Sequence, residues 1–257
     1  MAVTFQILSD THLECSIKSL TDMLDIKADV LCLLGDIGSP FQKSYVDFLQ
    51  ECSKSYKHVL VISGNHEYYN NKGYDIKTID DGIKGICSRF SNVHYLNNSN
   101  ITIGNVNFIG TTLWSSLPED VKHDVAKLYN DYNFIFQTSN VLLTPDFTNN
   151  MFKTNLAYLE KAITEGNEKG LSNVILSHHT PSFKFTDPKN EESLFRFGLS
   201  TELTHAFDGK YIKYWACGHT HVNFGDVDFN GTKLICNQFG RKTTSLSKFK
   251  RNKYYVL

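Results

Sequence analysis

The sequence predicts an α/β fold with two β-sheets, and two features support this prediction. In the first half, short apolar runs rich in β-branched residues alternate with segments of helical periodicity, as in a parallel sheet with crossover helices. In the second half, DVDFNGTKLIC (226–236) places two short runs around an Asn-Gly turn, which predicts an antiparallel hairpin. A mixed two-sheet α/β sandwich accounts for both halves.

The predicted elements follow one another without a linker-like change in composition or an internal repeat. We therefore expect a single domain over residues 1–257, with a loop-rich insertion at about 111–150 above the site. Strands are predicted at 3–10, 29–36, 58–65, 105–110, 173–179, 212–219 and 232–237. Helices are predicted at 17–24, 41–56, 74–90 and 151–166.

Composition and charge exclude few classes but favour a soluble protein of the cell interior. The 26 Lys and Arg residues balance 27 Asp and Glu residues, whereas generic DNA-binding and membrane-surface proteins are usually basic. The six cysteines form no CxxC pair, and several lie in apolar runs, as buried thiols of a reducing compartment do. The first residues lack the pattern of a signal peptide, and no apolar run approaches ~18 residues. We expect a soluble cytoplasmic protein.

Five predicted strands end in side chains that bind metals or transfer protons. Ligands of open α/β sheets bind outside the carboxyl ends of strands, so these side chains are expected to converge. Each also has an ordinary explanation when taken alone: Asp10 and Asp36 as cap or turn residues, and Asn65 in a left-handed turn. The set, in chain order, is Asp10, His12, Asp36, Asn65, His66, His178, His179, His219 and His221.

The donor types predict a metal centre without naming the metal. Imidazole nitrogens with carboxylate and amide oxygens, and no thiolate, suit Mn, Fe, Zn, Co or Ni, of which we favour Mn. The ligands are too many for one catalytic metal with an open position, but they suffice for two divalent ions if one carboxylate bridges. Two such ions about 3.5–4 Å apart can hold a phosphoryl group and activate water.

The motifs DxH, GD, GNHE, H and GHxH, in this order between residues 10 and 221, resemble the calcineurin-like metallophosphoesterase superfamily. More narrowly, SDTHLE, GNHEYY, IGTTLW, YNDY, SHHTPS and CGHTH are similar to small bacterial and phage-type predicted phosphohydrolases. The resemblance implies a four-layer αββα double-sheet sandwich. It also implies hydrolysis of a phosphomonoester or phosphodiester by a metal-bridging hydroxide.

The same resemblance assigns roles to the candidate residues. His66 would not bind metal; it would contact a phosphoryl oxygen or protonate the leaving group, for which an imidazole is suited near neutral pH. Asp36 would bridge the two ions. Asp10, His12 and His221 would bind one ion, and Asn65, His178 and His219 would bind the other.

The adjacent histidines of SHHTP need a choice between them. Neighbouring side chains of extended backbone point to opposite faces, so both are not expected on one metal. The resemblance selects His178, the first residue past the strand, and leaves His179 as a pocket residue or one that orients a ligand. By the same period of two, His219 and His221 are expected to point the same way.

The sequence departs from the superfamily pattern in two places. After the GD block, GDIGSPF lacks the aspartate and arginine of some phosphoprotein phosphatases. His66 therefore lacks that aspartate as a partner, and a phosphoprotein substrate is disfavoured. NQFGR replaces a stretch close to NPRGY, where Arg241 is either a phosphate contact or part of a solvated terminal strand. The candidate pocket residues, each equally an ordinary packing or capping residue, are Tyr68, Tyr69, Trp114, Asn130 and Asp131.

We therefore expect a metal-dependent phosphoesterase acting on a small phosphorylated molecule or a nucleotide. One alternative is a phosphoesterase fold kept as a binding scaffold, which would show a low metal content. The other is a nuclease, which the near-zero net charge disfavours and salt-dependent oligonucleotide binding would reveal. Substrate, native metals and oligomeric state are left open.

Overall fold

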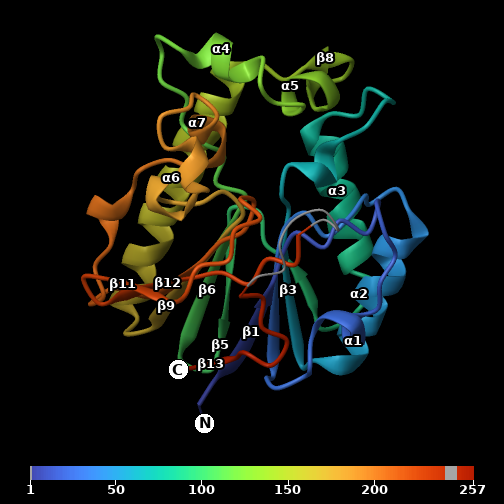
Figure 1. Cartoon of the computed structure of the whole chain (residues 1–257). Coiled ribbons are helices and arrows are strands. Elements are labelled where there is room, and N and C mark those ends of the chain that lie inside the picture. Colours follow the sequence, from blue (N-terminus) through green and yellow to red (C-terminus); the bar gives the residue numbers. More distant parts are fainter. Residues whose placement is uncertain (1, 241–247) are drawn as a thin grey trace.

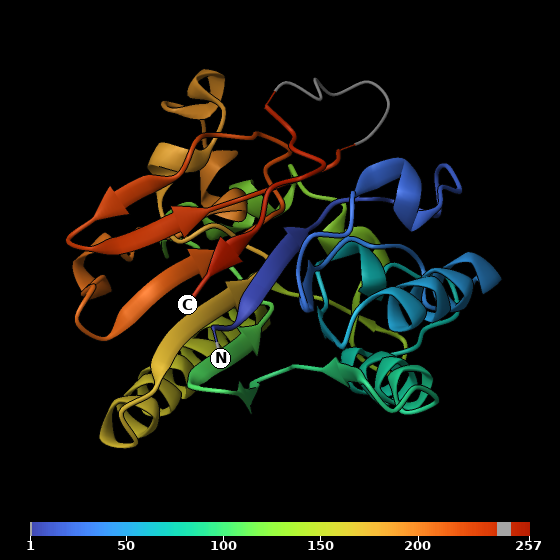
Figure 2. The ribbon, with the colours of Figure 1, turned by 90° about the horizontal axis from the view of Figure 1, so that it is seen from below.

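The computed structural model describes residues 2–240 and 248–257. Two β-sheets pack face to face, with helices on both outer faces (Figure 1), so the predicted αββα sandwich is confirmed. Seen from below, α2 (Lys43–Ser55) and α3 (Ile76–Cys87) lie beside one sheet and α6 (Pro145–Glu168) lies beside the other (Figure 2). Within the described ranges, no helix combines the length and the apolar character needed to cross a bilayer.

The first sheet has the strand order β13-β1-β2-β3-β4. Strands β1 to β4 are parallel, which confirms the parallel sheet predicted for β1 to β3, and β13 adds an antiparallel edge next to β1. Its strands are β1 (Thr4–Leu8), β2 (Val30–Leu34), β3 (His58–Ile62), β4 (Val93–Tyr95) and β13 (Tyr255–Val256). The helices between them are α1 (Leu20–Met23), α2 (Lys43–Ser55) and α3 (Ile76–Cys87), with the 3-10 helix η1 (His66–Tyr68) after β3.

The second sheet has the strand order β11-β12-β10-β9-β6-β5. Its central strands are parallel, and the predicted hairpin β11–β12 is antiparallel. Its strands are β5 (Ser99–Ile103), β6 (Val106–Thr111), β9 (Ser172–Ser177), β10 (Ile212–Ala216), β11 (Val227–Phe229) and β12 (Thr232–Ile235). The helices that accompany it are α6 (Pro145–Glu168), η2 (Phe183–Phe185), η3 (Pro188–Asn190), α7 (Arg196–Leu199) and η4 (Thr204–Ala206).

Alternate residues of each central strand enter different layers of the core. In β2, Val30, Cys32 and Leu34 pack between the two sheets. Leu31 and Leu33 pack against the outer helices. Because both faces of the strand are buried, the run VLCLL is apolar throughout rather than alternating.

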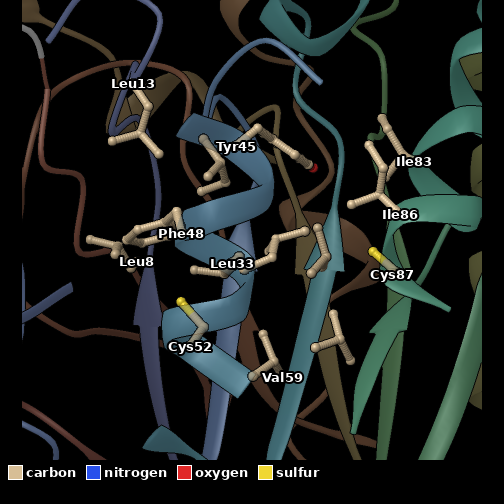
Figure 3. Packing of buried hydrophobic residues seen from close by; sticks show 14 of the residues in the cluster. Leu8, Leu13, Leu33, Tyr45, Phe48, Cys52, Val59, Ile83, Ile86 and Cys87 are labelled. Atoms are coloured by element: carbon tan, nitrogen blue, oxygen red, sulfur yellow. The ribbon is translucent and has the colours of Figure 1, made fainter. Parts of the chain in front are cut away.

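The helix layer over the first sheet depends on apolar residues at helical spacing. Tyr45, Phe48 and Cys52 lie on the face of α2 that meets the sheet, where they approach Leu8 and Leu33 (Figure 3). Complete burial of a side chain such as Leu33 stabilises the fold by about 1.5–3 kcal/mol relative to exposure. The packing of this continuous core therefore fixes the strands, and with them the positions of the strand ends.

The segment 111–150 contains short elements. They are α4 (Lys122–Ala126), α5 (Asp131–Phe134), and the hairpin of β7 (Phe136–Thr138) with β8 (Val141–Leu142). Helix α6 begins at Pro145, before the predicted start at 151, because Thr144 caps it by accepting a hydrogen bond from the backbone N–H of Phe147. In Figure 1, α4, α5 and β8 lie together at the end of the molecule opposite the termini.

Candidate metal centre

The predicted ligands follow the carboxyl ends of parallel strands from both sheets. Asp10 lies past β1, Asp36 past β2 and Asn65 past β3. His178 is the first residue after β9, and His219 lies three residues past the end of β10. The structure brings these residues together at one end of the sandwich, as the strand-end argument predicted.

One cluster contains Asp10, His12, Asp36 and His221, whose donor atoms lie within 4.8 Å of one another. His221 Nε2 is 3.0 Å from His12 Nε2 and 3.3 Å from Asp10 Oδ1. His12 Nε2 lies 3.7 Å from Asp36 Oδ2. Asp10, His12 and Asp36 are almost fully buried, so their donor atoms face one another rather than solvent.

A second cluster contains Asp36, His178 and His219. His178 Nε2 lies 3.2 Å from His219 Nδ1, 3.3 Å from the amide oxygen of Asn65 and 3.4 Å from Asp36 Oδ1. The two oxygens of Asp36 therefore face two different clusters, Oδ2 the first and Oδ1 the second. Asp36 has the geometry of a carboxylate shared between two ions.

Several candidate ligands have left-handed backbone. Asp10, His12 and Asp36 have φ values of 57°, 47° and 53°, and His219 and His221 have 71° and 54°. Such values are uncommon for residues other than glycine, and strain of this kind concentrates at functional sites. Because the chain is not extended at His219 and His221, the expectation that both point the same way is wrong: they face different clusters.

Glycines precede three of the candidate ligands because the backbone is crowded there. A Cβ at Gly64 would lie 2.2 Å from Asp36 Oδ1 and 2.6 Å from the ring of His178. A Cβ at Gly218 would lie 2.8 Å from Asp10 Oδ2. Glycine in the GN and GH pairs therefore lets the backbone pass close to the ligand side chains, where a larger residue would overlap them.

Hydrogen bonds outside the clusters orient the imidazoles. His178 Nδ1 donates to the carbonyl oxygen of Leu34 at 2.7 Å, which leaves Nε2 for a ligand role in the neutral ring. His12 Nδ1 lies 2.9 Å from Glu14 Oε1, so its Nε2 likewise faces the cluster. His179 Nδ1 instead contacts Ser115 Oγ at 2.9 Å, and its ring stacks on that of His219 at 4.1 Å.

The charges of the clusters shift several pKa values. Burial raises the pKa of Asp36, but the neighbouring His178, His66 and His12 outweigh this and hold it well below its usual range. Burial lowers the pKa of His178, but Asp36 outweighs it and raises the pKa to about 9. Ligand imidazoles must give up that proton to bind metal, so cation binding at this site competes with protons.

Glu14 is a carboxylate partner of His66 that the sequence analysis did not identify. His66 Nδ1 lies 3.2 Å from Glu14 Oε1, the same oxygen that His12 contacts. Burial raises the pKa of Glu14, but the hydrogen bonds with His12 and His66 outweigh it and lower the pKa to about 2. His12, Glu14 and His66 also form a third group of potential metal donors. The carboxylate comes from the DTHLE stretch, whereas some phosphoprotein phosphatases supply one from the segment after GD.

Glu67 joins the ends of β2 and β3 beneath the site. Its carboxylate, fully buried, accepts hydrogen bonds from the backbone N–H groups of Asp36 (2.9 Å), Ile37 (2.7 Å) and Gly64 (2.7 Å). Burial and the negative charge of Asp36 raise its pKa to about 7. The glutamate of GNHE is therefore structural and sets the relative position of two candidate ligands.

The candidate pocket residues divide into two groups. Tyr69 and Asp131 reach the site, since Tyr69 stacks on His66 at 4.3 Å and Asp131 contacts Asn65. Trp114 is buried between His179 and Tyr68, with ring centroids 5.4 and 5.9 Å away. The hydroxyl of Tyr68 donates to Asp80, and Asn130 is exposed next to α5. Arg241 lies outside the described residues.

A family model described as calcineurin-like phosphoesterase matches residues 3–223. The chain belongs to the calcineurin-like phosphoesterase family. The match contains every candidate ligand and His66. The chain is also 33% identical over 254 residues to "Uncharacterized protein L509" of Acanthamoeba polyphaga mimivirus, a similarity that covers 91% of this chain and 89% of that protein.

Solved structures share this phosphoesterase fold. A phosphopantetheinyl hydrolase from Mycobacterium tuberculosis superposes with a TM-score of 0.68 at 15% identity, over 92% of this chain and 89% of that one. A dimetal phosphatase from Danio rerio gives a TM-score of 0.53 at 15% identity, over 91% and 86% of the two chains. At this identity, the similarity shows the fold alone.

The donor set fits the divalent metals that this phosphoesterase family typically binds. Each cluster combines imidazole nitrogens with a carboxylate oxygen, and the carboxylate of Asp36 belongs to both. Such N and O donors accept Mn, Fe, Zn, Co or Ni and do not select among them. The assignment of each residue to a metal stays a prediction.

Proposed function

We propose that this protein is a phosphoester hydrolase that works with two divalent cations. The observation that carries the proposal is the position of Asp36, whose two oxygens face two separate groups of donor atoms. A single-ion site would not need a carboxylate placed in this way. The complete ligand set also argues against a binding scaffold, because a scaffold has no use for buried acidic and imidazole groups in strained backbone.

Each cation would have its own ligands in addition to the shared Asp36. When bound, the pair would supply the activation of a water molecule and the neutralisation of phosphate charge. Asn65 offers a neutral amide oxygen, so its cation would keep more of its positive charge than with a third carboxylate. Asp10, His12 and His221 would hold the first cation, and Asn65, His178 and His219 the second.

His66 would assist the departure of the leaving group. Its side chain is 17% exposed, whereas His12 beside it is 1% exposed, so His66 lies on the accessible side of the cluster. Because Glu14 holds Nδ1, proton exchange with a substrate would use Nε2. The carboxylate of Glu14 would stabilise the imidazolium form that donates the proton.

The substrate class we favour is a small phosphorylated molecule or a nucleotide. The net charge of −1 gives no support to a nucleic-acid backbone as substrate. Two structural neighbours, a phosphopantetheinyl hydrolase and a dimetal phosphatase, support the reaction class. Neither supports a particular substrate for this chain.

The test is hydrolysis of aryl phosphate monoesters and diesters by the protein loaded with Mn²⁺, followed by phosphorylated metabolites, nucleotides and cyclic nucleotides. We expect turnover that requires about two cations per chain by elemental analysis. Asp36→Asn should lose both the turnover and part of the metal. Absence of turnover with any of the five metals, together with an unchanged metal content in Asp36→Asn, would contradict the proposal.

A further inference from the structure

Asp131 brings a buried carboxylate to the metal centre from outside both sheets. It is the first residue of α5, in the segment that follows β6, and is 5% exposed. Its Oδ1 accepts hydrogen bonds from Asn65 Nδ2 at 2.8 Å and from the hydroxyl of Tyr69 at 2.5 Å. The carboxylate therefore contacts a candidate ligand and the ring that lies on His66.

The contact with Asn65 determines which end of its amide faces the second cluster. A carboxamide has an acceptor end and a donor end of nearly the same shape, and only the oxygen can bind a cation. A carboxylate only accepts, so Asp131 selects the orientation in which Nδ2 faces Asp131. The oxygen then faces His178, whose Nε2 is 3.3 Å away.

The contact with Tyr69 extends the same restraint to His66. The phenol ring of Tyr69 stacks on the imidazole with centroids 4.3 Å apart and planes 26° apart. Because the hydroxyl of Tyr69 is held by Asp131, the ring has a defined plane against which His66 packs. Asn65 and His66 are adjacent in the chain, so one carboxylate restrains two consecutive residues of the site.

The segment that carries Asp131 is itself firmly attached. The carbonyl oxygen of Phe134 accepts a hydrogen bond from the N–H of Asn70 at 3.0 Å. Ile135 is fully buried in the core of the first sheet's helix layer, and Phe136 forms a β-bridge with Asp75. These contacts hold the region of α5 against the chain just beyond η1, so the backbone that carries the Asp131 carboxylate has a defined position.

We propose that Asp131 is a positioning residue: it holds the amide oxygen of Asn65 toward the second cation and, through Tyr69, sets the plane of His66. This inference rests on the proposed function, since it requires two cations and a role for His66. It adds a residue from the segment 111–150 to a site whose other members follow strands of the two sheets.

The test compares Asp131→Leu with two other variants. Leucine has a similar size but no acceptor, so Asn65 loses the group that selects its orientation. Asp131→Asn keeps an acceptor oxygen at the same place and should restore most of the function. Asp80→Leu is the matched control, because Asp80 is also a carboxylate, partly buried, that accepts hydrogen bonds from two tyrosines, Tyr68 and Tyr95.

In Asp131→Leu we expect the affinity for the second Mn²⁺ to fall about 10- to 100-fold, the range for residues that orient metal ligands. Elemental analysis after dialysis should then give close to one ion per chain, against two for the wild type, Asp131→Asn and Asp80→Leu. Tyr69→Phe keeps the ring and the contact between Asp131 and Asn65. It should lower kcat for aryl phosphate several-fold with no change in metal content.

Two ions bound with wild-type affinity in Asp131→Leu would overturn the inference, as would an equal loss of metal in Asp80→Leu. An unchanged kcat in Tyr69→Phe would overturn the part that concerns His66. Should Asp131→Leu not fold, Asp131→Ser carries the same test, because its hydroxyl is too short to reach the amide of Asn65. A wild-type protein that binds fewer than two ions and hydrolyses no ester would refute the proposed function together with this inference.

Discussion

Replacement of Glu14 by glutamine tests the pairing of this carboxylate with His66. Glutamine keeps the size of the side chain and one acceptor oxygen but removes the charge. Glu14 Oε1 lies 2.9 Å from His12 Nδ1 and 3.2 Å from His66 Nδ1, so both imidazoles lose an ionic partner. We expect a slower reaction in which departure of the leaving group becomes more difficult.

The magnitude follows from the pKa of Glu14. Burial raises this pKa, but the hydrogen bonds with His12 and His66 outweigh it and lower the pKa from 4.5 to about 2. At about 1.4 kcal/mol per unit, the interaction amounts to about 3 kcal/mol. Because the side chain is 19% exposed, solvent screening reduces it to about 2 kcal/mol, divided between two imidazoles. About 1 kcal/mol at His66 corresponds to a roughly fivefold lower kcat.

The assay compares an aryl phosphate, which has a good leaving group, with an alkyl phosphate, which has a poor one, at saturating Mn²⁺. Saturation removes the contribution of weaker metal binding through His12. The loss of kcat should be greater for the alkyl ester, because only that leaving group depends strongly on protonation. Equal losses for the two esters, or no loss for either, would refute the role assigned to Glu14.

Five further variants make three tests of other parts of the chain. His178→Ala should retain one metal ion per chain and His179→Ala two, by elemental analysis; the opposite result would show that the SHHTP motif is aligned one residue too early. Gly64→Ala should abolish metal binding, because its Cβ would lie 2.2 Å from Asp36 Oδ1. By contrast, the Cβ of Gly82→Ala in α3 would meet nothing within 4 Å. This second variant should raise the free energy of unfolding in urea by about 0.5–1 kcal/mol. Glu67→Gln should lower the free energy of unfolding by about 1–3 kcal/mol, since its amide cannot accept all three backbone N–H groups; an unchanged urea midpoint would contradict this.

Most of the central strands were predictable because both of their faces are buried. Runs such as VLCLL and VLVI have no polar residue to contradict a strand, and candidate ligands follow two or three residues after the strand ends. The edge strands β4 and β13 were not predicted. They are only three and two residues long, and their pairing depends on neighbours far away in the sequence.

The convergence of the candidate ligands was predictable, but the direction of each side chain was not. An argument from the period of strands placed His219 and His221 on the same side, whereas their left-handed φ values direct them to different clusters. A local conformation of this kind is imposed by the surrounding structure, because the residue itself does not prefer it. Residue type and spacing therefore indicated a metal centre without giving its arrangement.

The sequence by itself determined the strand-helix alternation and the chemical character of the strand ends, because both depend on residues close together in the chain. Only the tertiary structure decided which carboxylate forms a hydrogen bond with which residue of the site. Glu14 contacts His66 across 52 positions and Asp131 contacts Asn65 across 66. Neither pair has a local signal in the sequence, since a hydrogen bond depends on distance in space and the fold decides which distant residues meet.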